Sequence, residues 1–417
     1  MRNRWSRHPF TNPHHNLPMP PPPDQAILDL FKRHFGYRPP LVTRAPATVT
    51  LLGDFAEASD GLALTVALER HVWLAAAPRT DGRIEIIHAD RAPEVFWISD
   101  PRPSSAAPWT DGFKAVLREL RQRRVHFNGF SAALHNDIPP GAGLGENAAL
   151  AAATALTLRK LFPFSLGESG ATVPPKRNER GELPPLTAPE RLHFARVCRD
   201  ALAAARVTGE GLVEALTTLG SRAWHALQLD CRFHSLTTAP LVGTALVMCD
   251  SGARPADVAS ARGQARDHCL AAARALGVKS LRSVEPHMVR AAGEKLAEAG
   301  RRAALHVTGE IQRAAAAERA LRDEDHRQLG QYLWLNDESR REHLGLATPE
   351  AELLLELARA DRACLGARLT GGAGGVTLNL VPHHEAEPFL ARMAGAFTAR
   401  TGRTLATWVG PIGEGAG

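Results

Sequence analysis

The chain has 417 residues, 44% of them hydrophobic and 23% charged, a composition that excludes disorder of the whole chain and allows two or three domains. No apolar run reaches the roughly 18 residues that a membrane span needs, and the first residues lack the apolar stretch of a secretory signal. The net charge is +6, but arginines alternate with glutamates and no aromatic residue interrupts a basic run, so we expect no nucleic-acid partner and no membrane.

Five cysteines are scattered along the chain, at positions 198, 231, 249, 269 and 364. Their odd number and the lack of CxxC spacing argue against a disulfide framework and against a structural zinc site. They stand in apolar stretches, which favours a place in the core over a role as nucleophile. We therefore expect a cytoplasmic protein without a metal-ligating cluster of its own.

Residues 1–23 are rich in proline and histidine and predict a disordered tail. Beyond them, strand pairs followed by helices predict an α+β fold, with antiparallel sheets covered by helices. Residues 164–188 are polar and rich in proline and glycine, which predicts a surface insertion between two helices. In chain order the predicted segments are strands at 48–52, 83–88 and 95–98, a helix at 111–122, a strand at 130–134, helices at 148–161 and 188–206, a strand at 244–249, helices at 260–276, 285–299 and 349–358, and a strand at 375–381.

The segment with the clearest chemistry is NDIPPGAGLGENAALAAATAL, at residues 136–156. A strand ends at Asn136, two prolines break it, three alternating glycines follow, and an alanine-rich helix begins near Asn147. Glycines let the backbone approach a ligand, and a helix N-terminus offers free N–H groups to an anion. The segment therefore predicts a phosphate cradle, although a tight strand–helix turn explains it equally well. It is neither a Walker A loop nor a dinucleotide G-x-G-x-x-G motif.

This loop resembles the PxGAGLSSSA loop of the galactokinases, within the GHMP family of small-molecule kinases. Two further segments resemble the family's other motifs. RAPATVTLLGDFAEASDG at residues 44–61 resembles RAPGRVNLIGEHTDYNDG, and GARLTGGAGGV at residues 366–376 resembles GARMTGGGFGGC with one residue fewer. Shorter matches fill the gaps, so the resemblance runs in order from about residue 25 to residue 410.

The resemblance implies a two-domain α+β fold like that of the GHMP kinases. Its N-terminal domain would have a ribosomal-protein-like fold and its C-terminal domain would be an α/β sandwich, with the active-site cleft between them. We expect the domains at residues 24–215 and 216–417. The family reaction turns ATP and galactose into ADP and galactose 1-phosphate, which implies ATP and Mg²⁺ as cofactors if the chain is active and none otherwise. A fold alone does not settle activity.

The resemblance places the nucleotide in the glycine loop and the catalytic base at Glu214. Glu214 replaces the family's catalytic Asp with a longer carboxylate, and a displacement of about 1 Å can lower a rate on the order of a hundredfold. A solvated helix glutamate beside Glu210 explains the residue as well. The nucleotide-binding residues implied by the loop are Gly141, Ala142, Gly143, Leu144, Gly145, Glu146 and Asn147.

Other positions imply losses at the reacting centre. The family's catalytic Arg becomes Thr48, which carries no charge. Its magnesium ligands become Asn147 and Leu202, and leucine cannot bind a cation that prefers oxygen. Glu146 offers a replacement ligand but places negative charge where a phosphate should sit. Asp200 is a second candidate, turned to another face of its helix.

The sugar contacts change as well. The family's GEHTD becomes Gly53-Asp54-Phe55-Ala56-Glu57, which keeps two carboxylates at altered length and removes side-chain hydrogen bonding at the His position. The family's sugar-binding Tyr aligns with Arg262, which suits an anionic ligand or is a solvated helix arginine. Such changes should lower specificity for galactose. The substrate-binding residues implied are Asp54, Phe55, Glu57, Asp60 and Arg262.

Three hypotheses therefore stay open. The first is a non-catalytic relative that binds a sugar or a nucleotide, or that partners another protein. The second is an active kinase on another substrate, with Glu214 as base and Glu146 or Asp54 holding magnesium. The third is a plain galactokinase that uses the substituted residues. We expect a sugar or another small molecule as ligand, and the sequence leaves open whether the chain is a monomer or an oligomer.

Overall fold

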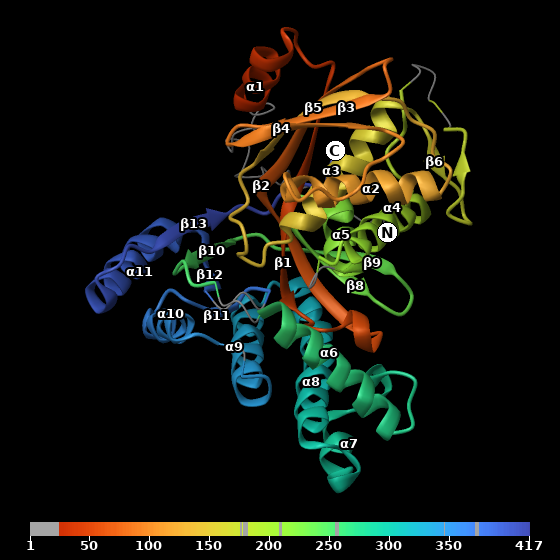
Figure 1. The fold of residues 1–417 in the computed structure, drawn as a ribbon. Helices are drawn as coiled ribbons and strands as arrows, with labels where there is room; N and C mark the ends of the chain where they lie inside the picture. Colours follow the sequence, from red (N-terminus) through yellow and green to blue (C-terminus); the bar gives the residue numbers. More distant parts are fainter. Residues whose placement is uncertain are drawn as a thin grey trace, which may run out of the picture.

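The computed structural model describes residues 25–175, 177, 182–207, 211–254, 258–345, 347–371 and 375–417. The tail predicted for residues 1–23 lies outside this part of the chain. The described residues form two large sheets covered by helices, together with a helical extension, which confirms the α+β fold (Figure 1). None of the described helices is long and apolar enough to cross a membrane.

The first sheet has seven strands in the order β4-β3-β5-β2-β8-β9, with β1 paired to β2. β2 is a long, almost continuously buried strand, which explains its apolar sequence LALTVALERHVWLAAAP. Strands β8 and β9 come from beyond residue 216, so this sheet crosses the expected domain boundary, and the boundary stays a prediction. The strands are β1 (Leu41–Leu52), β2 (Leu62–Pro78), β3 (Arg83–His88), β4 (Arg91–Trp97), β5 (Phe130–Asn136), β8 (His225–Asp230) and β9 (Ser235–Pro240).

Helices pack on both sides of this sheet. α3 lies against β1 and β2, and its many alanines allow close packing of the helix on the strands. α2 and α4 pack on α3, α5 packs on α4 and β1, and α1 packs against β5 and β2 through Ile27 and Phe31. These helices are α1 (Gln25–Phe35), α2 (Asp111–Gln122), α3 (Glu146–Leu161), α4 (Ala188–Ala204) and α5 (Leu212–Gly220).

The second sheet has four antiparallel strands in the order β11-β12-β10-β13. α10 and α11 cover it and share with it an apolar core that includes Phe389 and Phe397. Its elements are β10 (Thr244–Asp250), α10 (Pro349–Ala360), β11 (Gly366–Leu369), β12 (Val376–Pro382), α11 (Ala386–Thr401) and β13 (Ala406–Gly410).

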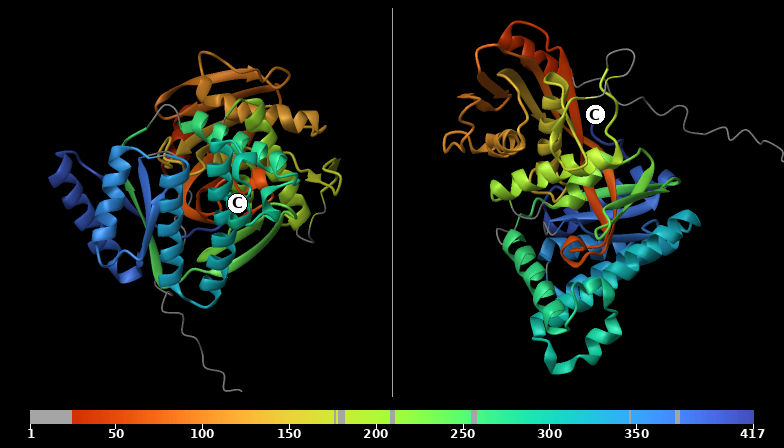
Figure 2. Two further views of the ribbon diagram at one scale, coloured as in Figure 1. Left: turned by 90° about the horizontal axis from the view of Figure 1, so that it is seen from below. Right: turned by 90° about the vertical axis from the view of Figure 1, so that its right-hand side faces the viewer.

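Of four further helices, α6, α7 and α8 form an extension that projects away from the two sheets, as Figure 2 shows in its right-hand view, whereas α9 packs on β11 of the second sheet. The extension has an apolar core of its own that includes the fully buried Val289 and Val307, and Phe55, in the turn after β1, packs against that core. α8 also contacts β2, which ties the extension to the first sheet. The helices are α6 (Val258–Ala275), α7 (Pro286–Ala291), α8 (Glu298–Arg322) and α9 (His326–His343).

Several predicted segments match closely, and the strand at 83–88 and the helix at 111–122 match to the residue. The single helix predicted over 285–299 is wrong. α7 ends at Ala291, a 3₁₀ turn follows in which Gly293 has a φ of 55°, and α8 begins at Glu298. The left-handed glycine breaks the helical path. The expected insertion at 164–188 carries a short hairpin of β6 (Ser165–Leu166) and β7 (Thr172–Val173).

Candidate active site

A small cavity of about 40 Å³ lies where the first sheet, the glycine loop, α5 and α6 meet. It joins five residues predicted for the site, namely Asp54, Gly143, Gly145, Glu214 and Arg262, and among the described residues the other predicted ones do not line it. The lining residues are Thr48, Val49, Thr50, Asp54, Thr65, Gly143, Gly145, Val213, Glu214, Thr217, Arg262 and Gly371.

Alternating glycines give the loop before α3 its shape. Gly141, Gly143 and Gly145 have φ values of 65°, 70° and 66°, in the left-handed region that other residues rarely adopt. A second backbone segment approaches the loop closely, because a Cβ on Gly371 would lie 2.7 Å from the Gly143 carbonyl oxygen. The glycines that suggest a ligand cradle therefore also serve the contact between two chain segments.

The same loop is fixed from both sides. The Thr48 N–H on β1 donates to the Leu144 carbonyl oxygen at 2.9 Å, and Thr370 Oγ1, after β11, donates to the Ala142 carbonyl oxygen at 2.7 Å. Ala142 and Leu144 are buried in the apolar core. These two predicted nucleotide-binding residues thus hold the loop in place through their carbonyl oxygens and their buried side chains.

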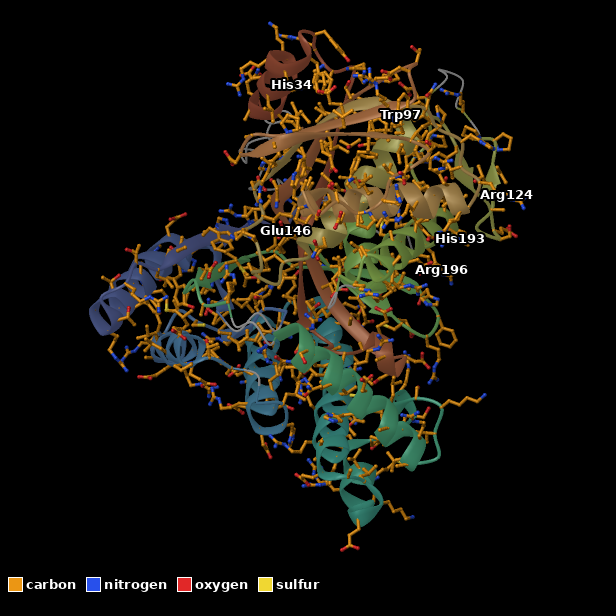
Figure 3. The ribbon with its side chains drawn as sticks, viewed as in Figure 1. His34, Trp97, Arg124, Glu146, His193 and Arg196 are labelled. Atoms are coloured by element: carbon orange, nitrogen blue, oxygen red, sulfur yellow. The ribbon has the colours of Figure 1, made fainter. Side chains whose placement is uncertain are left out.

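Glu146 is the first residue of α3, and Figure 3 shows it near the junction between the first sheet's helices and the C-terminal strands. Its Oε1 accepts a hydrogen bond from Asn136 Nδ2 at 2.7 Å. Burial raises the pKa of Glu146, and hydrogen bonds from Asn136 and the Gly141 backbone partly oppose the shift. A carboxylate therefore stands at the helix N-terminus that would receive phosphate. Asn147 follows it, half-buried, as the second residue of α3.

Thr48 faces Gly145 at the wall of the cavity. A Cβ on residue 145 would overlap Thr48 Oγ1. The Thr48 side chain is only 3% exposed, and its hydroxyl has no hydrogen-bond partner among the described residues. Because buried hydroxyls are almost always hydrogen-bonded, this one is a point where a water molecule or a ligand group can bind.

Glu57 and Glu214 meet at the N-terminus of α5. Glu214 Oε2 accepts from the Gly211 N–H at 2.9 Å and caps its own helix, while Glu57 Oε2 accepts from the Leu212 N–H at 2.7 Å. Burial, followed by the nearby charge of Glu214, raises the pKa of Glu57. Glu214 is half-buried and lines the cavity, whereas Glu57 stands behind it.

Asp54 forms a buried ion pair across the two sheets. Both of its carboxylate oxygens accept from Arg368 Nη2 at 2.8 Å, and Asn336 Nδ2 donates to Oδ2 at 3.3 Å. Arg368, on β11, also donates through Nη1 to the Leu51 carbonyl oxygen at 2.9 Å. The predicted sugar contact is therefore held by the protein's own arginine.

Charges around Asp54 keep it ionised. Burial alone would raise the pKa of Asp54, but Arg368, Arg340 and His306 outweigh that effect and hold the pKa far below its usual range. Glu310 on α8 fixes the backbone beneath it, because Glu310 Oε2 accepts from the N–H groups of Gly53 and Asp54 at 2.7 and 3.2 Å.

Arg262 closes one side of the cavity. Its Nη1 donates to the Gly371 carbonyl oxygen, and its guanidinium carbon lies 5.9 Å from the centre of the Phe55 ring. Phe55 has a left-handed φ of 58° and stands edge-on to His306, with ring centres 6.4 Å apart. Phe55 therefore does not line the cavity. It lies against Arg262, which does, and packs on the core of the extension.

Three other residues that the sequence analysis considered do not line the cavity. Asp60 is half-buried, with its side chain 47% exposed, and its carbonyl oxygen accepts from Arg282 Nη1 at 2.8 Å. Leu202 is buried in the core on α4, and Asp200 pairs with Arg123 at 2.8 Å. Among the described residues, no group of three His, Cys, Asp or Glu side chains is placed to hold a metal ion.

Sequence reasoning missed Arg254, which lies over the glycine loop. Its Nε donates to the Pro140 carbonyl oxygen at 3.1 Å, and its Nη1 and Nη2 donate to Asp250 at 2.9 and 2.7 Å. A Cβ on Gly141 would lie 3.3 Å from Arg254 Cδ. Arg254 lies in one of the shorter matches to the family, at residues 249–255, but nothing in that segment's spacing indicates that the arginine reaches the loop.

Solved structures with the same fold are small-molecule kinases. The structure of Lactococcus lactis galactokinase complexed with galactose matches with a TM-score of 0.82 and 18% identity, covering 94% of this chain and 99% of that one. A mevalonate kinase from Methanococcus jannaschii matches with a TM-score of 0.58 and 14% identity, covering 90% and 98%. The fold is therefore that of the GHMP kinases.

Comparisons of sequences identify the family within the GHMP kinases. Residues 29–78 match the galactokinase galactose-binding signature, and residues 112–172 match the GHMP kinases N terminal domain. A galactokinase from Roseiflexus sp. (strain RS-1) is 32% identical over 399 residues, 94% of this chain and 96% of that protein. The human galactokinase is 31% identical over 362 residues, 84% and 86% of the two chains. The chain belongs to the galactokinase family, as the motifs predicted.

Proposed function

We propose that this chain is a galactokinase homologue that binds a small hydroxylated ligand in the cleft and transfers phosphoryl groups weakly or not at all. The observation that carries the proposal is the charge of the cavity wall. Its described lining has two carboxylates, Asp54 and Glu214, and one guanidinium, that of Arg262. Phosphoryl transfer spreads negative charge over oxygens and needs cations aimed at them.

The uncharged wall at Thr48 supports the same conclusion. Asp54 is neutralised by Arg368, and Arg262 is bound to the Gly371 carbonyl oxygen. Glu214 forms no ion pair with any described residue within 4 Å, although it accepts the Gly211 N–H. Arg262, held by the Gly371 carbonyl oxygen, is the one described cation that lines the cavity, so a developing phosphate charge beside Glu214 would also meet a carboxylate.

Glu146 opposes nucleotide binding at the loop. A helix N-terminus attracts anions, and here the protein supplies one itself on the first residue of α3. Its carboxylate is held by Asn136 at 2.7 Å, so it does not swing freely into solvent. A triphosphate in the loop would have to displace it or lie beside it.

An active member of this family is expected to use ATP and Mg²⁺, but the described residues do not fit a magnesium ion. The aligned position Leu202 is buried among apolar side chains, and the nearby Asp200 is engaged by Arg123. Mg²⁺ needs oxygen ligands in near-octahedral geometry. These two positions therefore offer no magnesium ligand of this kind.

The experiment that tests the proposal is a paired measurement on the full chain. Galactose binding is measured by calorimetry, and galactose-dependent ADP release is measured with saturating ATP and Mg²⁺. Binding of a sugar without ADP release supports the proposal. Galactose-dependent ADP release at a rate typical of kinases, roughly 1–100 per second, contradicts it.

A second candidate function is an active kinase on a different small hydroxylated substrate. Two observations favour it: Glu214 lines the cavity, and the guanidinium of Arg254 lies over Gly141. Glu214 would accept the proton of the attacking hydroxyl. A panel of sugars and polyols tested for ADP release, with Glu214→Gln as the variant, separates this function from the first. Release that Glu214→Gln abolishes supports the second candidate.

A further inference from the structure

The N-terminus of α5 concentrates two carboxylates at one glycine. A Cβ on Gly211 would overlap Glu57 Oε2 and lie 3.4 Å from Glu214 Oε2, so the two side chains approach each other there. Each accepts one backbone N–H, and neither forms an ion pair with a described Lys, Arg or His within 4 Å. Two neighbouring carboxylates with no cation within ion-pair distance, and only the more distant charge of Arg199 opposing their repulsion, are electrostatically unfavourable when partly buried.

Across the cavity from α5 lies the unpartnered hydroxyl of Thr48. Thr48 is on β1 and is only 3% exposed, and its hydroxyl has no hydrogen-bond partner among the described residues. The neighbouring hydroxyls of Thr65 and Thr217 are satisfied by each other, with their Oγ1 atoms 2.8 Å apart. Thr50, the fourth threonine of the lining, is half-buried, so among the described lining residues Thr48 carries the buried hydroxyl that lacks a partner, and this hydroxyl is available as an acceptor.

The cavity has the size of one functional group. Its volume of about 40 Å³ exceeds the roughly 10–15 Å³ that a water molecule needs. It is far below the roughly 300–1,000 Å³ of a pocket that encloses a whole drug-sized ligand. Its charged lining consists of Asp54, which Arg368 neutralises, Arg262, which is bound to Gly371, and Glu214, which has no cation.

We propose that this cavity seats the cationic amino group of a small hydroxylated ligand, an amino sugar or amino polyol, between the Glu214 carboxylate and Thr48 Oγ1. An ammonium group offers three donors and needs oxygen acceptors, which these two residues supply. A metal ion is disfavoured because no metal-ligating cluster of three occurs among the described residues. This inference specifies the ligand class of the proposed function. It rests on the proposed function only for the hydroxylated part of the ligand.

The first test compares D-galactosamine with D-galactose by calorimetry on the full chain, at a pH below the pKa of the amine. We expect galactosamine to bind at least tenfold more tightly. Glu214→Gln should abolish this preference, Thr48→Val should reduce it several-fold, and Glu338→Gln, an exposed glutamate on α9, should leave it intact. Equal binding of the two sugars, or a preference that survives Glu214→Gln, overturns the proposal.

A second test needs no sugar binding. Thermal unfolding is followed in methylammonium chloride and in sodium chloride at equal ionic strength. The amine should raise the melting temperature of the unaltered chain but not of Glu214→Gln or Thr48→Val. Stabilisation by methylammonium with no binding of either sugar would keep the cation site and overturn the proposed function. Galactose binding without any effect of either amine would keep the proposed function and overturn the cation site.

Discussion

Thr48 and Gly145 fit together only as a pair, because a side chain at residue 145 would occupy the place of the Thr48 hydroxyl. The two residues come from β1 and from the glycine loop, and both line the cavity. In the family motifs that the sequence resembles, an arginine and a serine stand at these positions. The proposed divergence of the site therefore concerns both sides of one contact.

This contact can be measured by a double-mutant cycle. Gly145→Ala should destabilise the fold by about 1–3 kcal/mol, because the new methyl group overlaps Thr48 and residue 145 has a left-handed φ. Adding Thr48→Ala should recover part of the loss, with a coupling energy of about 1 kcal/mol. Urea unfolding gives the free energies. Gly263→Ala, on α6 with open space around it, is the control and should be neutral or stabilising. Strict additivity of the two changes would contradict this contact.

The ion pair of Asp54 with Arg368 should hold the two sheets together. Arg368→Met removes the cation from a buried carboxylate, and breaking a buried pair in this way typically lowers stability by about 3–5 kcal/mol. The matched control is Arg400→Met, which breaks a pair with Glu356 whose side chains are 55% and 63% exposed and should lower stability by about 1 kcal/mol or less. Urea denaturation compares them, and an equal effect of the two changes would refute a structural role for Arg368.

The same pair predicts a pH dependence. The folded-state pKa of Asp54 lies well below its usual range, so the folded state binds this proton less tightly than the unfolded state. The stabilisation is therefore present above the ordinary carboxyl pKa and is lost as the pH falls towards the folded value. Arg368→Met should flatten this acid-side slope of stability, measured as urea midpoints at descending pH. An unchanged slope would show that Asp54 is not the group responsible.

Glu57 should show the opposite dependence. Burial and the charge of Glu214 raise its folded pKa above 4.5, so the folded state binds this proton more tightly than the unfolded state. Its ionisation lowers stability as the pH rises from the unfolded to the folded pKa, and the loss persists at higher pH. Glu57→Gln, which can still accept the Leu212 N–H, should be more stable than the unaltered chain near neutral pH. The difference should vanish below a pH of about 4.5. A Glu57→Gln variant that is less stable at neutral pH would contradict the account.

Glu146 should weaken nucleotide binding. Glu146→Gln keeps the hydrogen-bonding shape and removes the charge at the N-terminus of α3, so we expect ATP to bind roughly tenfold more tightly, a change of about 1.4 kcal/mol. Calorimetry with and without Mg²⁺ measures it. Asp111→Asn changes the first residue of α2 in the same way, away from the loop, and should leave ATP binding unchanged. Equal affinities of the Glu146→Gln variant and the unaltered chain would show that the carboxylate does not oppose the nucleotide.

The sequence predicted the fold class and several elements correctly because hydrophobic periodicity reports which face of a segment is buried. Strand β3 and helix α2 match to the residue for that reason. β2 was missed, since a strand buried on both faces has no alternation to read. The helix at 285–299 failed because the periodic pattern continues across Gly293, whose left-handed backbone separates α7 from α8.

The site was predictable in its segments but not in its contacts. The motifs predicted that Asp54, the glycine loop and Glu214 belong to one site, and residues of all three line one cavity. It did not reveal that Asp54 pairs with Arg368, which is 314 residues away, or that Arg254 reaches the loop. Glu57, one methylene longer than the family's aspartate, turns to the N-terminus of α5. These hydrogen bonds and ion pairs depend on which groups lie within reach of each side chain in the folded structure. A sequence pattern does not contain that information.

The most direct test of the central claim is ADP release by the full chain with saturating ATP, Mg²⁺ and galactose, compared with the same mixture without galactose. The account predicts that galactose raises the rate little or not at all, because the described lining of the cavity offers the transferring phosphoryl group one guanidinium, that of Arg262, which is already bound to the Gly371 carbonyl oxygen. Galactose-dependent release that Glu214→Gln abolishes would contradict the account and identify the chain as a working kinase.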